Sequence, residues 1–213
     1  MTTKRYVVAA LIGLVATTAA AQGTATARVA VAPTSKLWID GTSNLHGWSC
    51  KAEKLEANID FDAAVAAEVS VAPPKALKKV EVKVPVKSLK CGHGAMDDNL
   101  YKALNADATP DVSYIMATFE AVAGDTKDTF TLKTVGTLSI AGKENKLAMD
   151  VTATRMPDGT LKAVGMVPIK MTDYGIKPPT AIFGRLKTGD EVKVNFELTV
   201  GAKALAAAIN DQK

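Results

Sequence analysis

The residues of this chain best suited to chemistry are two cysteines, each with a histidine close by. Cys50 comes four positions after His46, and Cys91 comes two positions before His93. A thiolate beside an imidazole can act as a nucleophile, and cysteine with histidine can also hold zinc. In an oxidising compartment, two such cysteines are instead expected to form a disulfide. The compartment therefore decides which chemistry to expect.

The start of the chain predicts export. Lys4 and Arg5 precede an uncharged apolar run over residues 6–15, and small residues suited to cleavage follow at 19–21. This is the pattern of a signal peptide over residues 1–21. The apolar run is shorter than the roughly 20 residues that a membrane-spanning helix needs. We therefore expect a cleaved, periplasmic or secreted protein with no stable membrane span.

Export makes a disulfide between Cys50 and Cys91 the expected state. The two cysteines are 41 positions apart and form no C-x-x-C motif, which disfavours a redox or zinc pair. A structural zinc site needs four well-placed ligands, and the sequence does not supply them. We predict no metal and no resident cofactor.

Catalytic patterns are weak in this sequence. It contains no G-x-S-x-G, P-loop or G-x-G-x-x-G motif. We therefore predict no catalytic residues. An enzyme that uses His46 and Asp97 as acid and base is kept as an alternative hypothesis.

Charge and composition narrow the class of protein. Loss of residues 1–21 removes Lys4 and Arg5 and lowers the formal charge from +4 to +2. No basic stripe remains, which excludes a typical nucleic-acid-binding protein. The mature chain of about 190 residues fits one domain. It is rich in valine, alanine and threonine, a composition that favours strands.

Apolar and polar residues alternate along most of this domain, which predicts antiparallel strands joined by short turns. A short helix is expected over residues 97–104, with Asp97 or Asp98 as its N-cap. Residues 22–35 are expected to be flexible, and residues 201–213 to form a tail. Strands are expected over residues 36–42, 44–50, 55–61, 80–86, 112–123, 129–141, 146–155, 160–172 and 191–200.

These elements predict an all-β fold with about eight antiparallel strands and one short helix. Strands of ten or more residues favour a barrel over a sandwich. A barrel of eight strands encloses either packed side chains or one small ligand.

Four segments, in order along the chain, resemble the polyisoprenoid-binding YceI-like family of exported bacterial proteins. They are Trp38–Gly47, Gly136–Lys143, Ile169–Ile176 and Gly189–Leu198, and the resemblance extends over residues 36–200. It implies an extended lipocalin-like antiparallel β-barrel with an apolar tunnel. That tunnel would bind a polyisoprenoid, an isoprenoid quinone or a similar amphiphilic lipid chain.

The chain departs from the family pattern at two places. Many members carry an arginine two residues before the aspartate of the D-[FY]-G element, where this chain has Met171. Residues 178–184 form an insertion that we expect to be a lid or rim loop, stiffened by two prolines and bearing Phe183.

Alternation along the strands predicts which side chains line the tunnel, although a one-residue slip would turn each strand over. Leu100 and Leu104 of the helix are expected to close one end, with Trp48 and Phe183 at the mouth. The expected ligand-binding residues are Trp38, Trp48, Leu100, Leu104, Tyr114, Met116, Leu138, Ile140, Met149, Val151, Met166, Phe183 and Phe196.

Two matters stay open at this level. The same side chains could pack into a filled barrel without a ligand, in a structural or stress-response protein of the periplasm. An exposed barrel edge or an apolar mouth could also pair two copies into a homodimer.

Overall fold

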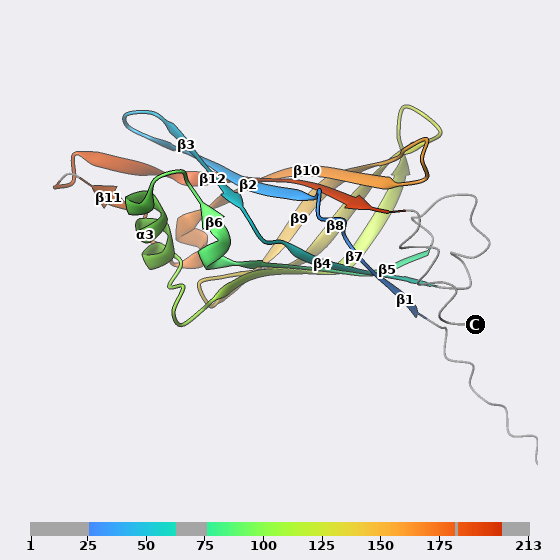
Figure 1. Cartoon of the computed structure of the whole chain (residues 1–213), viewed down its shortest axis with the longest axis horizontal. Coiled ribbons are helices and arrows are strands. Elements are labelled where there is room, and N and C mark those ends of the chain that lie inside the picture. The colour runs from blue at the N-terminus through green and yellow to red at the C-terminus, as the bar shows by residue number, and fades with distance from the viewer. Residues whose placement is uncertain (1–25, 63–75, 182, 202–213) are drawn as a thin grey trace, which may run out of the picture.

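A computed structural model of the chain describes residues 26–62, 76–181 and 183–201. The expected signal peptide at residues 1–21 lies outside the described residues, as does the predicted tail beyond Gly201. Most of what is described is antiparallel strand, drawn as arrows in Figure 1.

The described residues contain twelve strands, two short 3-10 helices and one α-helix. The first half comprises β1 (Thr26–Ala30), β2 (Lys36–Ser43), β3 (Gly47–Ala52), β4 (Glu56–Asp62), β5 (Leu77–Pro85), η1 (Val86–Ser88), β6 (Leu89–Lys90) and α3 (Gly94–Ala103). The second half comprises β7 (Asp111–Ala123), β8 (Thr129–Ile140), β9 (Lys143–Arg155), β10 (Leu161–Lys170), η2 (Met171–Tyr174), β11 (Thr180–Ala181) and β12 (Leu186–Val200).

The strands form one sheet that curls back on itself. Its hydrogen-bonded order is β1-β4-β5-β7-β8-β9-β10-β12-β2-β3-β6, with β11 paired to β12. Strands β3 and β4 follow each other along the chain, yet they lie near opposite ends of this order. The same is true of β5 and β6, and of β1 and β2. The chain itself therefore joins the two ends of the sheet and produces the barrel-like shape in Figure 1.

Backbone hydrogen bonds at the bends between these strands complete the closure. The Ala32 N–H donates to the Thr199 carbonyl at 2.7 Å, and the Glu53 N–H donates to the Ser88 carbonyl at 2.9 Å. Val86, just after β5, donates to the Pro110 carbonyl at 2.8 Å, immediately before β7. A closed sheet leaves few unpaired edges, which is how barrels avoid edge-to-edge association.

The predicted all-β, lipocalin-like antiparallel barrel with a short helix is confirmed. The number of strands exceeds the expected eight because bends break three strands into two pieces each and the two-residue β11 adds one more. Pro85 marks one such bend, since it ends β5 and precedes η1. Proline cannot donate a ladder hydrogen bond, so a strand ends or bulges where it occurs.

The expectation of flexibility over residues 22–35 is wrong for residues 26–30, which form β1. Ala27 and Val29 are buried inside the barrel, where β1 pairs with β4. Arg28, on the outer face, holds Asp60 of β4 with two hydrogen bonds of 2.6 and 2.8 Å. Pairing with a strand far along the sequence, rather than local propensity, orders this segment.

The helix starts earlier than predicted. α3 begins at Gly94 with His93 as its N-cap residue, so neither Asp97 nor Asp98 caps it. Asp97 has another role: its Oδ1 accepts the Cys91 N–H at 2.7 Å, which ties the helix to the preceding segment. Of the helices in the described ranges, none has the length and apolar character needed to cross a bilayer.

The barrel wall has a seam between β9 and β10. The two strands pair from Arg155 with Leu161 as far as Val151 with Gly165, and in the described structure their pairing goes no further. The Met156 N–H donates to the Thr160 carbonyl across the turn. In this register, the even-numbered residues of β9 and β10 are those whose backbone N–H and C=O groups point toward the other strand. Pro168 is the second such residue of β10 beyond the last pair, and it has no N–H to donate. A second pocket lies over this seam, lined by residues of β7, β8, β9 and β10.

The Arg28–Asp60 pair predicts acid sensitivity of the β1 attachment. Its hydrogen bonds lower the pKa of Asp60, so the pair stabilises the fold above the ordinary aspartate pKa of about 4 and loses this effect as pH falls through the lowered value. We expect Asp60→Asn to lower the urea midpoint at pH 7 and to differ less from the parent protein in acid. Asp107→Asn, in the exposed Lys87–Asp107 pair, is the control and should change little. A deficit that stays constant at all pH values would contradict this role.

Candidate functional site

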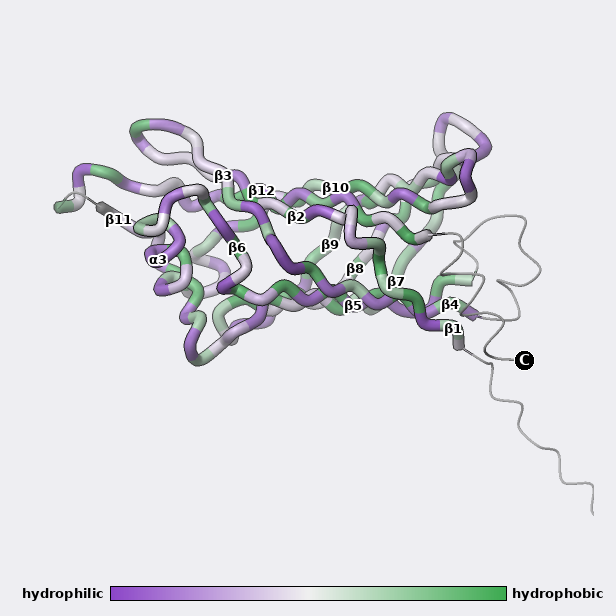
Figure 2. The backbone as a smooth tube through the Cα atoms, viewed as in Figure 1, coloured by the Kyte–Doolittle hydropathy of each residue, from purple (hydrophilic) through white to green (hydrophobic). Residues whose placement is uncertain are grey.

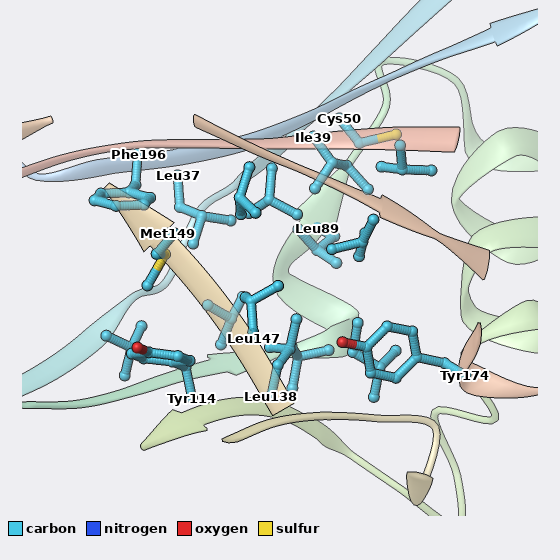
Figure 3. Close-up of a pocket in the computed structure, with 18 of the residues that line it drawn as sticks. Leu37, Ile39, Cys50, Leu89, Tyr114, Leu138, Leu147, Met149, Tyr174 and Phe196 are labelled. Atoms are coloured by element: carbon cyan, nitrogen blue, oxygen red, sulfur yellow. The ribbon is translucent and has the colours of Figure 1, made fainter. Parts of the chain in front are cut away.

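The barrel encloses an apolar cavity of about 350 Å³. Side chains from β2, β4, β5, β7, β8, β9, β10 and β12 line it, together with residues of α3 and η2. Figure 3 shows Phe196, Leu37 and Ile39 on one wall, facing Tyr114 and Leu138 on the other. Its volume falls in the range of small-molecule sites, which is about 300–1,000 Å³.

The period of two along each strand makes this interior apolar. On β12, residues 192, 194, 196, 198 and 200 face the cavity and are all apolar, whereas Lys193, Asn195 and Glu197 face away. The same alternation is visible as changes of hydropathy along the strands in Figure 2. In a closed sheet one face of every strand turns inward, so the apolar sets converge on one lumen.

Three inward-facing glycines each accommodate an aromatic ring from a neighbouring strand. A Cβ on Gly41 would collide with the Trp48 ring, and one on Gly165 would collide with the Phe196 ring. A Cβ on Gly136 would lie 2.5 Å from both the Ile115 carbonyl oxygen and the Tyr114 ring. The rings can therefore lie flat against the backbone, so that large side chains line the lumen without filling it.

The buried polar groups of the lumen are internally satisfied. The Tyr114 hydroxyl donates to Thr134 Oγ1 at 3.4 Å, and Thr134 Oγ1 donates to the Met149 carbonyl at 3.0 Å. Burial raises the pKa of Tyr114, so the phenol stays neutral at ordinary pH. Burial likewise raises the pKa of Tyr174, at the other end of the view in Figure 3. Neither phenol is poised to act as a base, and among the described residues no aspartate, glutamate, lysine or arginine lines the lumen.

One end of the cavity has a polar rim, near α3 and the turn between β2 and β3. Polar side chains join the lining here, in contrast to the apolar barrel centre. They are Ser43, His46, Asn99, Thr180 and Thr188. Trp48 also lies at this end, with its indole N–H donating to the Thr42 carbonyl at 3.1 Å. We refer to this end as the mouth.

A disulfide joins Cys50 of β3 to Cys91, just before α3. Both residues line the cavity, and Cys50 is almost fully buried. Beside it, Lys90 Nζ donates to the Tyr101 hydroxyl of α3 at 2.7 Å, and that hydroxyl lies 2.9 Å from the Leu89 carbonyl. The disulfide and these hydrogen bonds hold α3 against the barrel end, where Leu100 and Leu104 face the lumen.

The structure places ten of the thirteen predicted ligand-binding residues in the cavity lining. Contact with a ligand stays a prediction for each of them. They are Trp48, Leu100, Leu104, Tyr114, Met116, Leu138, Ile140, Met149, Val151 and Phe196.

Trp38, Met166 and Phe183 are corrected, because the structure places all three outside the lining. Trp38 lies between the inward Leu37 and Ile39, and its indole N–H donates to Asp40 at 3.1 Å. Met166 precedes the inward Val167 and is 52% exposed. Both are one-residue slips of the kind that alternation permits. Phe183 is at the mouth end, in the turn after β11, but its side chain is fully exposed.

Sequence reasoning missed several lining residues that share a signal. They continue the alternation of apolar residues on strands from which the sequence analysis named few lining residues or none. They include Leu37, Ile39, Ile59, Phe61, Val80, Val82, Val84, Leu132, Leu147, Val167, Ile169, Val192 and Val194. Met171, where many family members carry arginine, is also part of this lining and adds an apolar surface instead of a charge.

The alternative acid–base pair is not supported by the contacts of its members. His46 Nδ1 lies 2.7 Å from the carbonyl of Gly47, and Asp97 is engaged by Cys91 and by Lys90 at 3.6 Å. Across the residues that the structure describes, no three histidine, cysteine, aspartate or glutamate side chains gather as metal ligands would.

Comparison with known proteins identifies the class. The model of the YceI-like domain matches residues 20–200, and the chain belongs to this family. Among curated proteins, the sequence search found no match.

Solved structures show the same fold at low sequence identity. BcnA of Burkholderia cenocepacia superposes with a TM-score of 0.61 at 19% identity, over 79% of this chain and 98% of that one. A polyisoprenoid binding domain from Saccharophagus degradans gives 0.61 at 13% identity, over 83% and 98%. The YceI protein of Campylobacter jejuni gives 0.52 at 22% identity, over 70% and 82%.

The glycine–aromatic contacts predict a steric effect of a single methyl group. Gly136→Ala places its Cβ against the Ile115 carbonyl and the Tyr114 ring, so we expect a loss of about 1–3 kcal/mol in unfolding free energy. Gly47→Ala, on β3, is the control, because its nearest contact would be an ordinary 3.6 Å. Urea unfolding of both variants measures the difference. Equal effects of the two substitutions would show that the ring contact is unimportant.

The disulfide predicts a redox-dependent stability. It closes a loop of 41 positions, so its removal in a Cys50→Ala/Cys91→Ala variant should cost about 4 kcal/mol in the chain-entropy model. Reductant should lower the urea midpoint of the parent protein and leave that of the variant unchanged. An intact mass that does not rise by two hydrogens on reduction would exclude the bond.

Proposed function

We propose that this chain is an exported, non-enzymatic binding protein that holds a polyisoprenoid or similar amphiphilic lipid chain in its barrel. The observation that carries the proposal is the cavity itself, because its central lining is apolar and uncharged along several strands. Polyisoprenoid binding in the name of the Saccharophagus degradans domain is consistent with this ligand class.

The energetics of the site fit a long apolar chain. Burial contributes about 0.8 kcal/mol per CH₂, so such a ligand needs few polar contacts in order to bind. The inward-facing methionines, Met116, Met149 and Met171, are flexible and polarisable, and they can adapt to an irregular chain.

The distribution of polar groups gives the ligand a direction. Apolar residues surround the middle of the lumen, whereas Ser43, His46 and Asn99 lie at the mouth. The apolar chain would therefore enter the barrel, and a polar head group such as a quinone would stay at the rim. Hydrogen-bond donors at the mouth suit a quinone, because its oxygens act as acceptors.

Organic extraction of purified protein followed by mass spectrometry tests the ligand class. We expect a prenyl or fatty-acyl species that copurifies with the folded protein and is absent after denaturation and washing. Repeated extraction without any such species, together with failure to bind an added isoprenoid quinone, would favour a filled barrel without a ligand.

A lumen-filling substitution should weaken binding selectively. Val167 faces the lumen and is 7% exposed, whereas Val164 on the same strand faces outward and is 39% exposed. We expect Val167→Phe to displace about two CH₂ groups of ligand and weaken binding about tenfold. Val164→Phe is the matched control and should bind normally. Titration with an isoprenoid quinone measures both, with circular dichroism to confirm that each variant is folded.

A further inference from the structure

Two turns at the mouth expose large apolar side chains that the lumen does not use. Leu45 lies between β2 and β3 and is 72% exposed, and Phe183 lies after β11 and is 108% exposed. Figure 1 shows both turns at the end of the barrel that carries α3. Exposed apolar residues that gather on one part of a surface commonly mark a site of contact with a partner or a membrane.

Hydrogen bonds join these two turns into one unit. The Asn44 amide Nδ2 donates to the Arg185 carbonyl at 2.8 Å, and the Lys187 N–H donates to Asn44 Oδ1 at 2.8 Å. The Asn44 N–H also donates to the Lys187 carbonyl at 3.0 Å. Leu45, directly after Asn44, is thus held in a fixed relation to the turn that carries Phe183. We call Leu45, Phe183 and the cations Lys177, Arg185 and Lys187 the rim surface.

The charge of this surface has a single sign. Residues 174–188 contain Lys177, Arg185 and Lys187 and no acidic residue, and residues 41–50 contain no acidic residue either. All three cations are exposed, and within the described ranges none of them takes part in an ion pair. The nearest carboxylates along the chain are Asp173, four positions before Lys177, and Asp190, three positions after Lys187. Asp190 already accepts two hydrogen bonds from Thr172. The cations are therefore available to an anionic partner.

The rim surface borders the opening of the cavity. Ser43 and His46, on either side of Leu45, line the lumen, as do Thr180 and Leu186 on either side of Phe183. Projecting apolar side chains flanked by exposed cations match the interface of an anionic bilayer, where apolar groups insert and lysine and arginine meet head groups. We propose that the rim surface docks on an anionic phospholipid bilayer and sets the mouth against it.

Docking gives the apolar ligand a route that avoids water. A lipid chain that leaves the lumen through a mouth seated on a bilayer passes from one apolar medium to another. This transfer role rests on the proposed function, whereas docking itself does not require a lumen ligand. The two ideas can therefore fail separately.

Tryptophan substitutions at matched turns report insertion directly. Phe183→Trp places an indole on the rim surface, and Met156→Trp places one in the β9–β10 turn, where Met156 is 38% exposed. We expect the emission of the Phe183→Trp protein to shift to shorter wavelength with phosphatidylcholine–phosphatidylglycerol vesicles, beyond any change shown by Met156→Trp. No shift, or an equal shift from both variants, would overturn the proposal.

Vesicle sedimentation separates the apolar and electrostatic contributions. Leu45→Ser/Phe183→Ser should bind the mixed vesicles about tenfold more weakly or worse, and Met156→Ser should bind like the parent. Arg185→Gln/Lys187→Gln should lose about fivefold for each cation on mixed vesicles, with a smaller loss at high salt. A parent protein that binds no vesicles would overturn the proposal and leave a protein partner as the occupant of this surface.

The same variants distinguish docking from ligand binding. Circular dichroism should show the parent fold in all of them, because the changed side chains are exposed. Quinone titration should give the parent affinity, since none of these side chains lines the lumen. Loss of vesicle binding with quinone binding retained supports docking as a separate property. A rim variant that lost both in parallel would show that the rim belongs to the lumen site and would refute a separate docking surface.

Discussion

Backbone pairing around a closed ring is the constraint on which the rest of this structure depends. Each bent strand pairs in its two halves with different neighbours, and the bends let the sheet meet itself. Once the ring is closed, every strand has an inside and an outside, and the alternation in the sequence becomes one apolar lumen. The helix, the disulfide and the rim turns then only have to close or border the ends of a shape that the ladder has already set.

The lumen stays open because its bulky aromatic side chains lie beside glycines, which have no side chain. Tyr114, Trp48 and Phe196 would each fill the interior if they pointed across it, but Gly136, Gly41 and Gly165 let their rings lie against the wall. Aromatic rings over glycine also restore the apolar cover that glycine lacks in a strand. The cavity is thus a product of paired choices on adjacent strands, and substituting either partner alone changes its width.

Local sequence pattern was sufficient to predict the long strands. It was insufficient where tertiary contacts determine whether a segment is a strand or which face turns inward. The strands at 111–123 and 129–140 could be predicted because their alternation is long and their turns carry glycine. β1 could not be predicted, since a short segment rich in Ala, Thr and Val has the composition of a linker. Its order depends on pairing with β4, where Arg28 donates a hydrogen bond to Asp60. The alternation over residues 36–42 predicts Trp38 inside, but alternation alone cannot say which face of a strand turns inward, and Leu37 with Ile39 occupy that face. Pro168 was a readable signal of the seam in the wall.

The seam between β9 and β10 affects the tendency of the molecule to associate with other molecules. An incompletely paired edge is a template on which a strand of another molecule can add, and repetition of such a contact leads to aggregates. Here the exposed stretch of β10 carries Pro168, which cannot complete a ladder, and β9 presents Lys146 and Asp150 outward beside it. The gap in the wall is therefore a poor acceptor for a foreign strand. Under the proposed binding function, the barrel can keep one incompletely paired side without a strong tendency to aggregate at high concentration.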